Sequence, residues 1–341
     1  MKKIINYIGI GLTIISFPFN VLAYSNKVIM GGQNVGININ SNGVMVVGFY
    51  KINGVYNGSK LMAGDYIYEV GSKSVNTINE LVKAIDSEAK DNQVEIKYRR
   101  GNNTYKTTLN LEYKDNVYKT GLYVKDNLLG NGTLTYIDPK TKIYGALGHN
   151  VIESNTKSRV EIKDGSIFKS VISSVTKSSD GNPGSINTKF YKDKVYGTIN
   201  KNVESGIFGN YLESIDNDAL IEVASIDEVK LGEASIYTNL YNNDVREYKI
   251  NILRVDKSGK IKNIYFEVTD EALLNKAGGI VQGMSGSPIV QNGKLIGAVT
   301  HVLIDDVTTG YGISIITMLE EGEKNNWFNG QLFYNLMFFD S

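Results

Sequence analysis

The chain has 341 residues, which is enough for two domains of ordinary size, and its 36 basic and 36 acidic residues cancel. A neutral chain without a long basic stretch is not typical of nucleic-acid-binding proteins. The sequence has no Cys and only two His, which excludes disulfides, a thiol nucleophile, Cys-based zinc sites and three-histidine metal sites. We therefore expect no metal and no cofactor, and an enzyme of this composition would use Ser, Thr, Lys or a carboxylate as its nucleophile.

The first 23 residues have the pattern of an export signal. Lys2 and Lys3 form a charged start, residues 4–19 are mostly apolar, and Val21-Leu22-Ala23 resembles a cleavage site. An uncleaved membrane anchor formed by residues 4–22 is the alternative, because its length is nearly sufficient. In both cases we expect the rest of the chain to lie outside the cytoplasm, which is also the side that the positive-inside rule gives.

Residues 27–113 are expected to form a first α+β module. Thr77 and Glu80 make a capping box, which predicts a helix that runs to about Lys90. Around this helix, apolar patterns between turn residues predict strands at 35–39, 43–49, 61–70, 94–98 and 105–109, the last two as a hairpin.

This order of strands around one capped helix, with the phrase AGDYIYEVGSKSV, resembles a PDZ domain of the bacterial protease type. A PDZ domain binds a peptide terminus as an added strand, and a loop of backbone N–H groups caps the carboxylate. The resemblance implies that this peptide-binding loop is Gly31, Gly32, Gln33, Asn34, Val35 and Gly36. A plain Gly-rich turn is the alternative interpretation.

Residues 117–341 are expected to form a second, mainly β domain. Short strand patterns are separated by Gly, Asn and Asp turns, which predicts a barrel or sandwich of six or more strands. Helices are expected only at Asp270–Lys276 and near Ile316–Glu323.

The segment GGIVQGMSGSPIV places Ser285 in a tight Gly turn directly before a strand. The glycines leave the Ser285 hydroxyl unshielded, and the N–H groups of Gly283 and Ser285 can converge as an oxyanion hole. The pattern G-x-S-G-x-P, followed by GKLIGAVTH, resembles the nucleophile region of trypsin-like proteases. A Gly-rich β-turn with an incidental Ser is the alternative.

A Ser nucleophile needs a base, and His149 and His301 are the two candidates. His149 follows the small residues of YGALG at a predicted strand end, where an imidazole is accessible. His301 lies in the middle of a predicted strand, where we interpret it as lining the substrate groove or as a hydrogen-bonded core residue. We expect His149 to be the base.

The segments GLYVKDNLLGNGTLTYIDPKTKIYGALGHNV and GGIVQGMSGSPIVQNGKLIGAVTHV, together with the first module, resemble the SpoIVB peptidase family. These are the stage IV sporulation protein B enzymes of endospore-forming bacteria. The resemblance implies a PDZ module followed by a trypsin-like serine peptidase, exported into the space between the forespore and mother-cell membranes. It further implies that the enzyme cleaves itself and a membrane-bound regulator. Cleavage of the regulator releases an intramembrane protease, and this protease activates a late sigma factor.

The resemblance carries the catalytic His onto His149, the Ser onto Ser285 and the acid, fifteen positions before the Ser, onto Asp270. The residues alone favour Asp270 as the N-cap of a helix that stops at Gly278-Gly279. Asp164 and Asp180 are the other acids considered. Met284 stands where trypsin-like proteases carry the acid that pairs with a new N-terminus, so activation by that ion pair is not expected.

Two other functions compete with the signalling endopeptidase. One is a non-catalytic PDZ adaptor attached to an inert barrel. The presence of His149, Ser285 and an acid favours the enzyme, because a protease that has lost its activity in evolution usually lacks one of these residues. The other is a broad quality-control protease of the periplasmic type, in which PDZ modules follow the catalytic domain, whereas here the module comes first.

Overall fold

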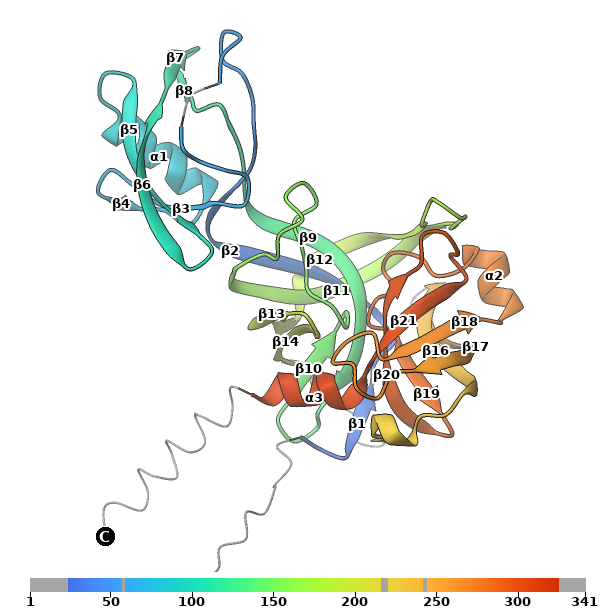
Figure 1. Ribbon diagram of the computed structural model, residues 1–341. Helices are drawn as coiled ribbons and strands as arrows, with labels where there is room; N and C mark the ends of the chain where they lie inside the picture. The colour runs from blue at the N-terminus through green and yellow to red at the C-terminus, as the bar shows by residue number, and fades with distance from the viewer. Residues whose placement is uncertain (1–23, 57–58, 216–219, 242–243, 325–341) are drawn as a thin grey trace, which may run out of the picture.

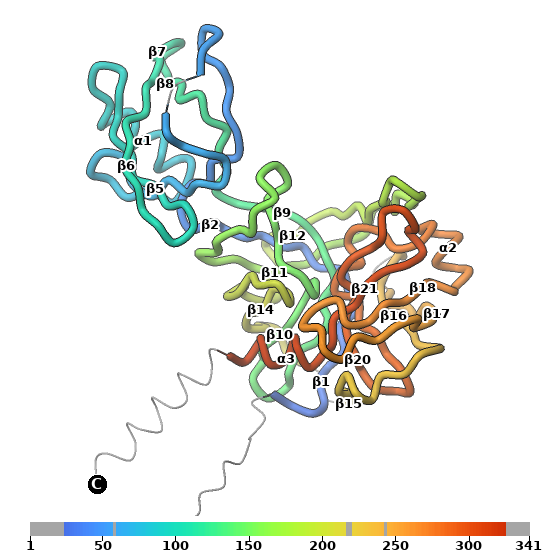
Figure 2. Tube along the Cα trace, viewed as in Figure 1, coloured from blue at the N-terminus to red at the C-terminus, as the bar shows by residue number. Residues whose placement is uncertain are grey.

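The computed structural model describes residues 24–56, 59–215, 220–241 and 244–324. The predicted export signal lies outside these residues. The chain is mainly β, as predicted, with a smaller N-terminal module and a larger closed barrel (Figures 1 and 2). Among the described helices, none has the length and apolar character needed to cross a bilayer.

The N-terminal module packs one helix against an antiparallel sheet. The helix α1 (Ile78–Glu88) has the predicted capping box, in which the Thr77 side chain accepts from the Glu80 N–H and Glu80 accepts from the Thr77 N–H. It buries Leu81 and Ile85 in the module's core. The strands confined to the module are β3 (Tyr66–Val70), β4 (Lys73–Ser74), β5 (Gln93–Arg100), β6 (Asn103–Asn110), β7 (Glu112–Lys114) and β8 (Val117–Lys119).

Two long strands connect the module to the barrel. They are β2 (Asn34–Phe49) and β9 (Leu122–Ile137), which pair antiparallel along most of their length. The C-terminal half of β2, which we call its far half, pairs with β3 in the module. The N-terminal half, which we call its near half, pairs with β11 (Ile162–Thr176) in the barrel. The two parts of the molecule therefore share strands.

The barrel contains both helices that the sequence predicts in this region, α2 (Glu271–Ala277) and α3 (Ile315–Glu323). Its other elements are β1 (Lys27–Met30), β10 (Ile143–Ala146), β12 (Ser185–Thr198), β13 (Lys201–Val203), β14 (Gly206–Asn210), β15 (Leu220–Val223), a 3₁₀ turn (Ile226–Glu228), β16 (Gly232–Tyr241), β17 (Asp244–Val255), β18 (Ile264–Val268), β19 (Pro288–Gln291), β20 (Lys294–Val302) and β21 (Thr309–Ser314).

The structure corrects the placement of the predicted peptide-binding loop, residues 31–36. The N–H groups of Gly31 and Gly32 donate to the carbonyls of Thr135 and Leu134 at 2.9 and 2.8 Å, so they are not free to cap a carboxylate. From Asn34 onward the segment is part of β2, with β9 on one edge and β11 on the other. Because both edges are occupied, a peptide cannot add as a strand here.

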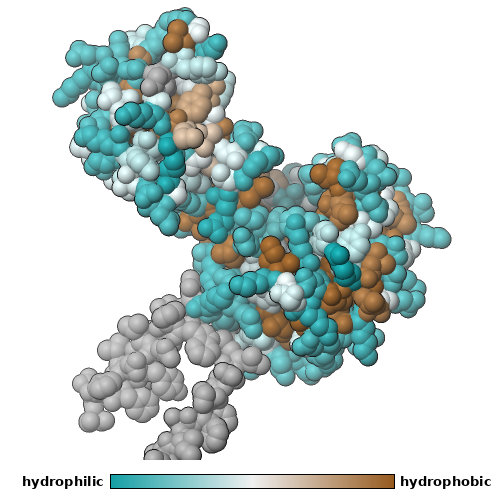
Figure 3. Space-filling view, viewed as in Figure 1, coloured by the Kyte–Doolittle hydropathy of each residue, from teal (hydrophilic) through white to brown (hydrophobic). Residues whose placement is uncertain are grey.

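The same pairings show that residues 27–41 belong to the barrel, although the sequence assigns them to the first module. β1 pairs with β15 and β9, and the near half of β2 lies between β9 and β11. The identity of the module as a PDZ domain stays a prediction. Figure 3 shows apolar residues on the surface of both parts of the molecule. In the module, the exposed large hydrophobic residues include Val55, Tyr56 and Met62.

Candidate active site

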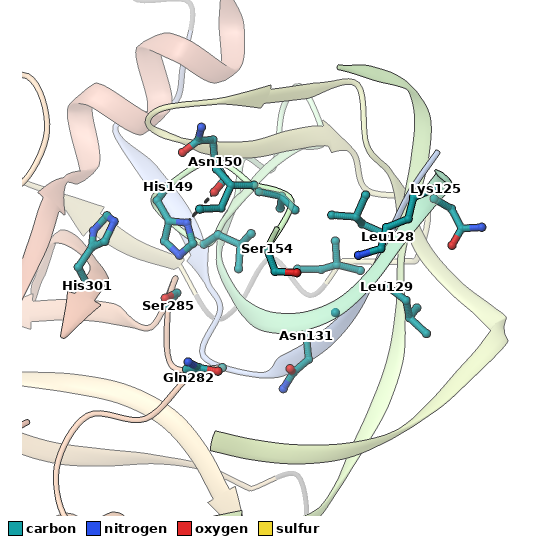
Figure 4. A pocket seen from close by; sticks show the side chains of 17 residues that line it. Lys125, Leu128, Leu129, Asn131, His149, Asn150, Ser154, Gln282, Ser285 and His301 are labelled. Atoms are coloured by element: carbon teal, nitrogen blue, oxygen red, sulfur yellow. Dashed lines mark hydrogen bonds between the residues drawn. The ribbon is translucent and has the colours of Figure 1, made fainter. Parts of the chain in front are cut away.

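A cavity of about 650 Å³ lies in the barrel and contains the predicted nucleophile and both histidines in its wall. Figure 4 shows His149 and Ser285 next to each other, His301 beyond them, and Leu129 and Asn131 of β9 farther along the cavity. The sequence prediction that His149 and Ser285 come together therefore agrees with this arrangement, although they are 136 positions apart in the chain.

Ser285 occupies a turn that requires glycine on its C-terminal side. Gly286 has φ +94°, and a Cβ there would lie 2.0 Å from the carbonyl oxygen of Thr133. The turn is fixed to β9, because the Thr133 N–H donates to the Ser285 carbonyl at 2.8 Å and the Thr133 hydroxyl donates to the Gly283 carbonyl at 2.8 Å. The Ser285 side chain remains half-buried, with its hydroxyl donating to the Thr300 carbonyl at 2.9 Å.

The backbone around Ser285 leaves two N–H groups available for an oxyanion hole. The Gln282 carbonyl accepts from Ile186 and the Met284 carbonyl accepts from Ser287, both within the fold. In a planar trans peptide the N–H points opposite to the C=O, so the N–H groups of Gly283 and Ser285 point away from these partners. Across the described residues neither N–H donates to a protein acceptor, and both residues line the cavity.

His149 follows β10 through a backbone turn in which Leu147 and Gly148 have φ of 68° and 67°. Its Nδ1 lies 2.8 Å from the Asn150 carbonyl oxygen. A carbonyl can only accept, so Nδ1 carries the proton and Nε2 has the free lone pair that a general base needs. Burial lowers the pKa of His149, and the Lys262 charge lowers it further, against the opposing effect of the Asn150 hydrogen bond.

His301 lies on β20 and its ring is 5.1 Å from that of His149, centroid to centroid. It lines the cavity and its side chain is exposed, which agrees with groove lining and not with a core position. Partial burial of the ring lowers the pKa of His301 to about 4, and the nearby His149 and Lys262 contribute to this shift. His301 is therefore neutral at neutral pH.

Comparison with known protein families shows which family the chain belongs to. The family of SpoIVB peptidases, S55, matches residues 116–319. The chain belongs to this family. The match begins at the end of the N-terminal module, just before β8, and includes His149, Asp270 and Ser285, and the membership supports a serine peptidase.

Solved structures with some similarity are also proteases. The active form of the Rv3671c protease from M. tuberculosis is 12% identical, with 57% of this chain and 73% of that chain covered and a TM-score of 0.32. The HtrA-type protease AlgW with a decapeptide is 11% identical, with 58% and 52% covered and a TM-score of 0.31. No curated protein matches the chain significantly.

In this SpoIVB-family chain, Asp270 does not lie against His149. It is the N-cap of α2: one carboxylate oxygen accepts from the Leu273 N–H at 3.0 Å and the other from the Lys249 N–H at 3.2 Å. Both oxygens are thus engaged by backbone groups, and Asp270 is not among the residues that line the cavity. The structure corrects the triad assignment and supports the N-cap alternative.

The other acids considered do not replace Asp270. Asp164 accepts from the Asn40 side chain at 2.6 Å, and Asp180 accepts from the Val307 N–H at 3.3 Å. No acidic side chain is found among the described residues that line the cavity. The group that orients His149 in this SpoIVB-family chain is therefore the Asn150 carbonyl.

Sequence reasoning missed Thr133 and Thr300, which hold the nucleophile turn. Thr133 lies about 150 positions before Ser285, and both residues act largely through backbone groups, which any residue type supplies. The hydroxyls of Thr133 and Thr135, which donate to the carbonyls of Gly283 and Gly286, are side-chain signals, but Thr in a strand is too common to be read as functional.

Proposed function

We propose that the chain is an exported serine endopeptidase with Ser285 as the nucleophile and His149 as the general base. The observation that carries this proposal is the shared cavity, in which the Ser285 hydroxyl and the base-competent tautomer of His149 lie next to two free backbone N–H groups. These are the three groups that acyl transfer from a peptide requires.

The chemistry follows from this arrangement. The Ser285 hydroxyl leaves the Thr300 carbonyl by rotation about its Cα–Cβ bond and gives its proton to Nε2 of His149 as its oxygen attacks the substrate carbonyl. The N–H groups of Gly283 and Ser285 stabilise the oxyanion. His149 then protonates the departing amine, and water hydrolyses the acyl-enzyme by the reverse proton path.

The biological role is proposed from the family. A SpoIVB peptidase in sporulation signalling would cleave itself and a membrane-bound regulator of an intramembrane protease, so that a late sigma factor becomes active. Export across the cytoplasmic membrane, with release or anchoring by residues 4–22, would put the peptidase in the space between the forespore and mother-cell membranes. Binding of a peptide terminus by the N-terminal module remains part of the proposal.

A non-catalytic adaptor is the second candidate, and one observation favours it. The Ser285 hydroxyl donates to the Thr300 carbonyl and no carboxylate contacts His149 among the described residues, so the resting site is not an assembled triad.

The test is labelling of the purified full chain with a fluorophosphonate, alongside mass spectrometry of self-cleavage products. We expect a covalent adduct on Ser285, no adduct in Ser285→Ala, and loss of cleavage on the order of 10⁶ in rate for Ser285→Ala or His149→Ala. The double variant should be little worse than either single one. A native chain that neither reacts nor cleaves would support the adaptor.

A further inference from the structure

The strand β9 is paired on only one edge where it passes the cavity. From Asn127 to Asn131 it pairs with β2, residue by residue. On the other edge, β10 pairs with β9 only from Leu134 to Ile137. No strand of the described chain pairs with this second edge at residues 127–131, which we call the open edge of β9.

The direction of the backbone groups on the open edge follows from Thr133. Its N–H donates to the Ser285 carbonyl and its carbonyl accepts from the Leu147 N–H at 3.3 Å, so both groups point away from β2. In an antiparallel pair, alternate residues point their N–H and C=O to the same side. The register is unbroken from Asn34↔Thr133 to Asn40↔Asn127, so Asn131, Leu129 and Asn127 also point away from β2.

The cavity runs along this open edge. Five consecutive residues, 127–131, line it. A strand that turned one face to a cavity would contribute alternate residues, so a consecutive run means that the backbone edge itself is presented. Figure 4 shows this part of β9 on one side and the segment that follows His149 on another, with Ser285 near the end of the groove.

The surroundings of the open edge suit an extended, largely apolar segment. Gly130 is exposed, and a Cβ built there would meet nothing within 4 Å. Apolar side chains flank the groove, among them Leu128, Leu147 and Val151. The charged residue in the wall, Lys125, is already paired with Glu153 at 2.6 Å.

We propose that a substrate segment of about five residues binds as an added β-strand on the open edge of β9, with its apolar side chains in the groove. The proposal rests on the proposed peptidase function, and it names how that site holds its substrate. Thr133 already joins the edge to the carbonyl of Ser285, so the added strand leads directly to the nucleophile. Strand addition thus takes place on β9 and not on β2, whose edges are filled.

The test is retention of peptides from a tryptic digest of a bacterial proteome on the immobilised full chain carrying Ser285→Ala. Two further variants are compared in this background. Leu129→Pro removes an N–H that points into the groove, at an edge position where Pro is tolerated, and Leu129→Ala removes the same side chain but keeps the N–H. We expect Leu129→Pro to retain about tenfold less peptide than Leu129→Ala, the effect of one lost hydrogen bond. Equal retention by the two variants would overturn the proposal.

A second measurement covers the case in which Leu129→Pro fails to fold. A retained peptide is resynthesised with N-methyl groups at odd or at even positions, and its affinity for the Ser285→Ala chain is measured. An added strand predicts that one of the two sets weakens binding about tenfold or more and the other does not. Equal affinities of both methylated peptides and the parent would refute strand addition. Retention does not need a nucleophile, so fluorophosphonate labelling decides the proposed function separately.

Discussion

The rings of His149 and His301 lie 5.1 Å apart in the wall of the cavity, and neither has an acidic partner among the described residues. A proton on one ring therefore disfavours a proton on the other, and the nearby Lys262 disfavours both. The pair is held in the neutral state, which is the state in which His149 can accept the proton of Ser285.

The first prediction concerns the pH dependence of cleavage. Because burial lowers the pKa of His149 from the ordinary 6.5, the neutral base persists into more acidic solution, and the acid limb of kcat/KM should lie below pH 6.5. Lys262→Met, which removes the positive charge, should move this limb to higher pH. A profile of kcat/KM between about pH 4 and 8 checks both statements. A limb above pH 6.5 in the native chain would contradict them.

The second prediction separates the two interpretations of Asp270. As the N-cap of α2, Asp270 can be replaced by Asn with little change, whereas Asp270→Ala should lower the free energy of unfolding by about 0.5–2 kcal/mol. If Asp270 were the triad acid, its replacement by Asn would lower the turnover of the enzyme by roughly 10⁴-fold. The structure predicts near-native turnover for Asp270→Asn, measured with the melting temperature on one preparation. A large loss of turnover in a stable Asp270→Asn chain would show that the acid reaches His149 in the working enzyme.

The third prediction concerns the buried carboxylate of Glu153. Burial by itself would raise the pKa of Glu153, but Lys125 and the N–H groups of Thr156 and Asn155 lower it to about 2. Glu153→Gln removes the buried carboxylate that accepts from Lys125 and from these N–H groups, and should cost about 1–3 kcal/mol. The stability from this carboxylate is present above pH 4.5 and is lost as the pH falls towards 2.

The control for Glu153 is the exposed ion pair of Glu95 and Lys106, in which Nζ of Lys106 lies 2.6 Å from Oε2 of Glu95. Glu95→Gln should cost less than about 1 kcal/mol, because water screens the pair. Urea unfolding of both variants supplies the comparison. Similar losses in the two would mean that the Glu153 pair is no stronger than a surface pair.

The fourth prediction tests the placement of residues 31–36 in the barrel. A Cβ at Gly36 would lie 2.1 Å from the ring of Phe168, which is 1% exposed. Gly36→Ala should therefore destabilise the whole barrel, by about 1–3 kcal/mol. Gly130→Ala, where a Cβ meets nothing within 4 Å, is the stability control. Unchanged melting of Gly36→Ala would contradict the placement and restore a peptide-binding loop as the interpretation.

The sequence was sufficient for features that short-range chemistry determines. The capping box at Thr77 was predicted because Thr77 lies three residues from the N–H that it accepts from. The residues alone also favoured Asp270 as an N-cap for the same reason, but the family resemblance led us to assign it to the triad, which the structure corrects. The placement of Ser285 and His149 in one cavity was predicted from Gly-rich patterns and the family resemblance. By contrast, residues 31–36 were misassigned, because their partners in β9 and β11 lie about 100 and 130 positions away and no local pattern reports them.

The strands β2 and β9 also impose an order on how this chain can be completed during synthesis. The first module's sheet includes Leu122 and Val124 of β9, so it stays unfinished until that part of the chain has been made. The near half of β2 stays unpaired on its second edge until β11, which ends at Thr176, has been synthesised. A nascent chain that pauses between these points exposes a long half-paired strand, which is the kind of surface that aggregates or recruits a chaperone. Because the two parts share strands, neither the module nor the barrel can finish folding until the part of the chain that pairs with β2 has been synthesised.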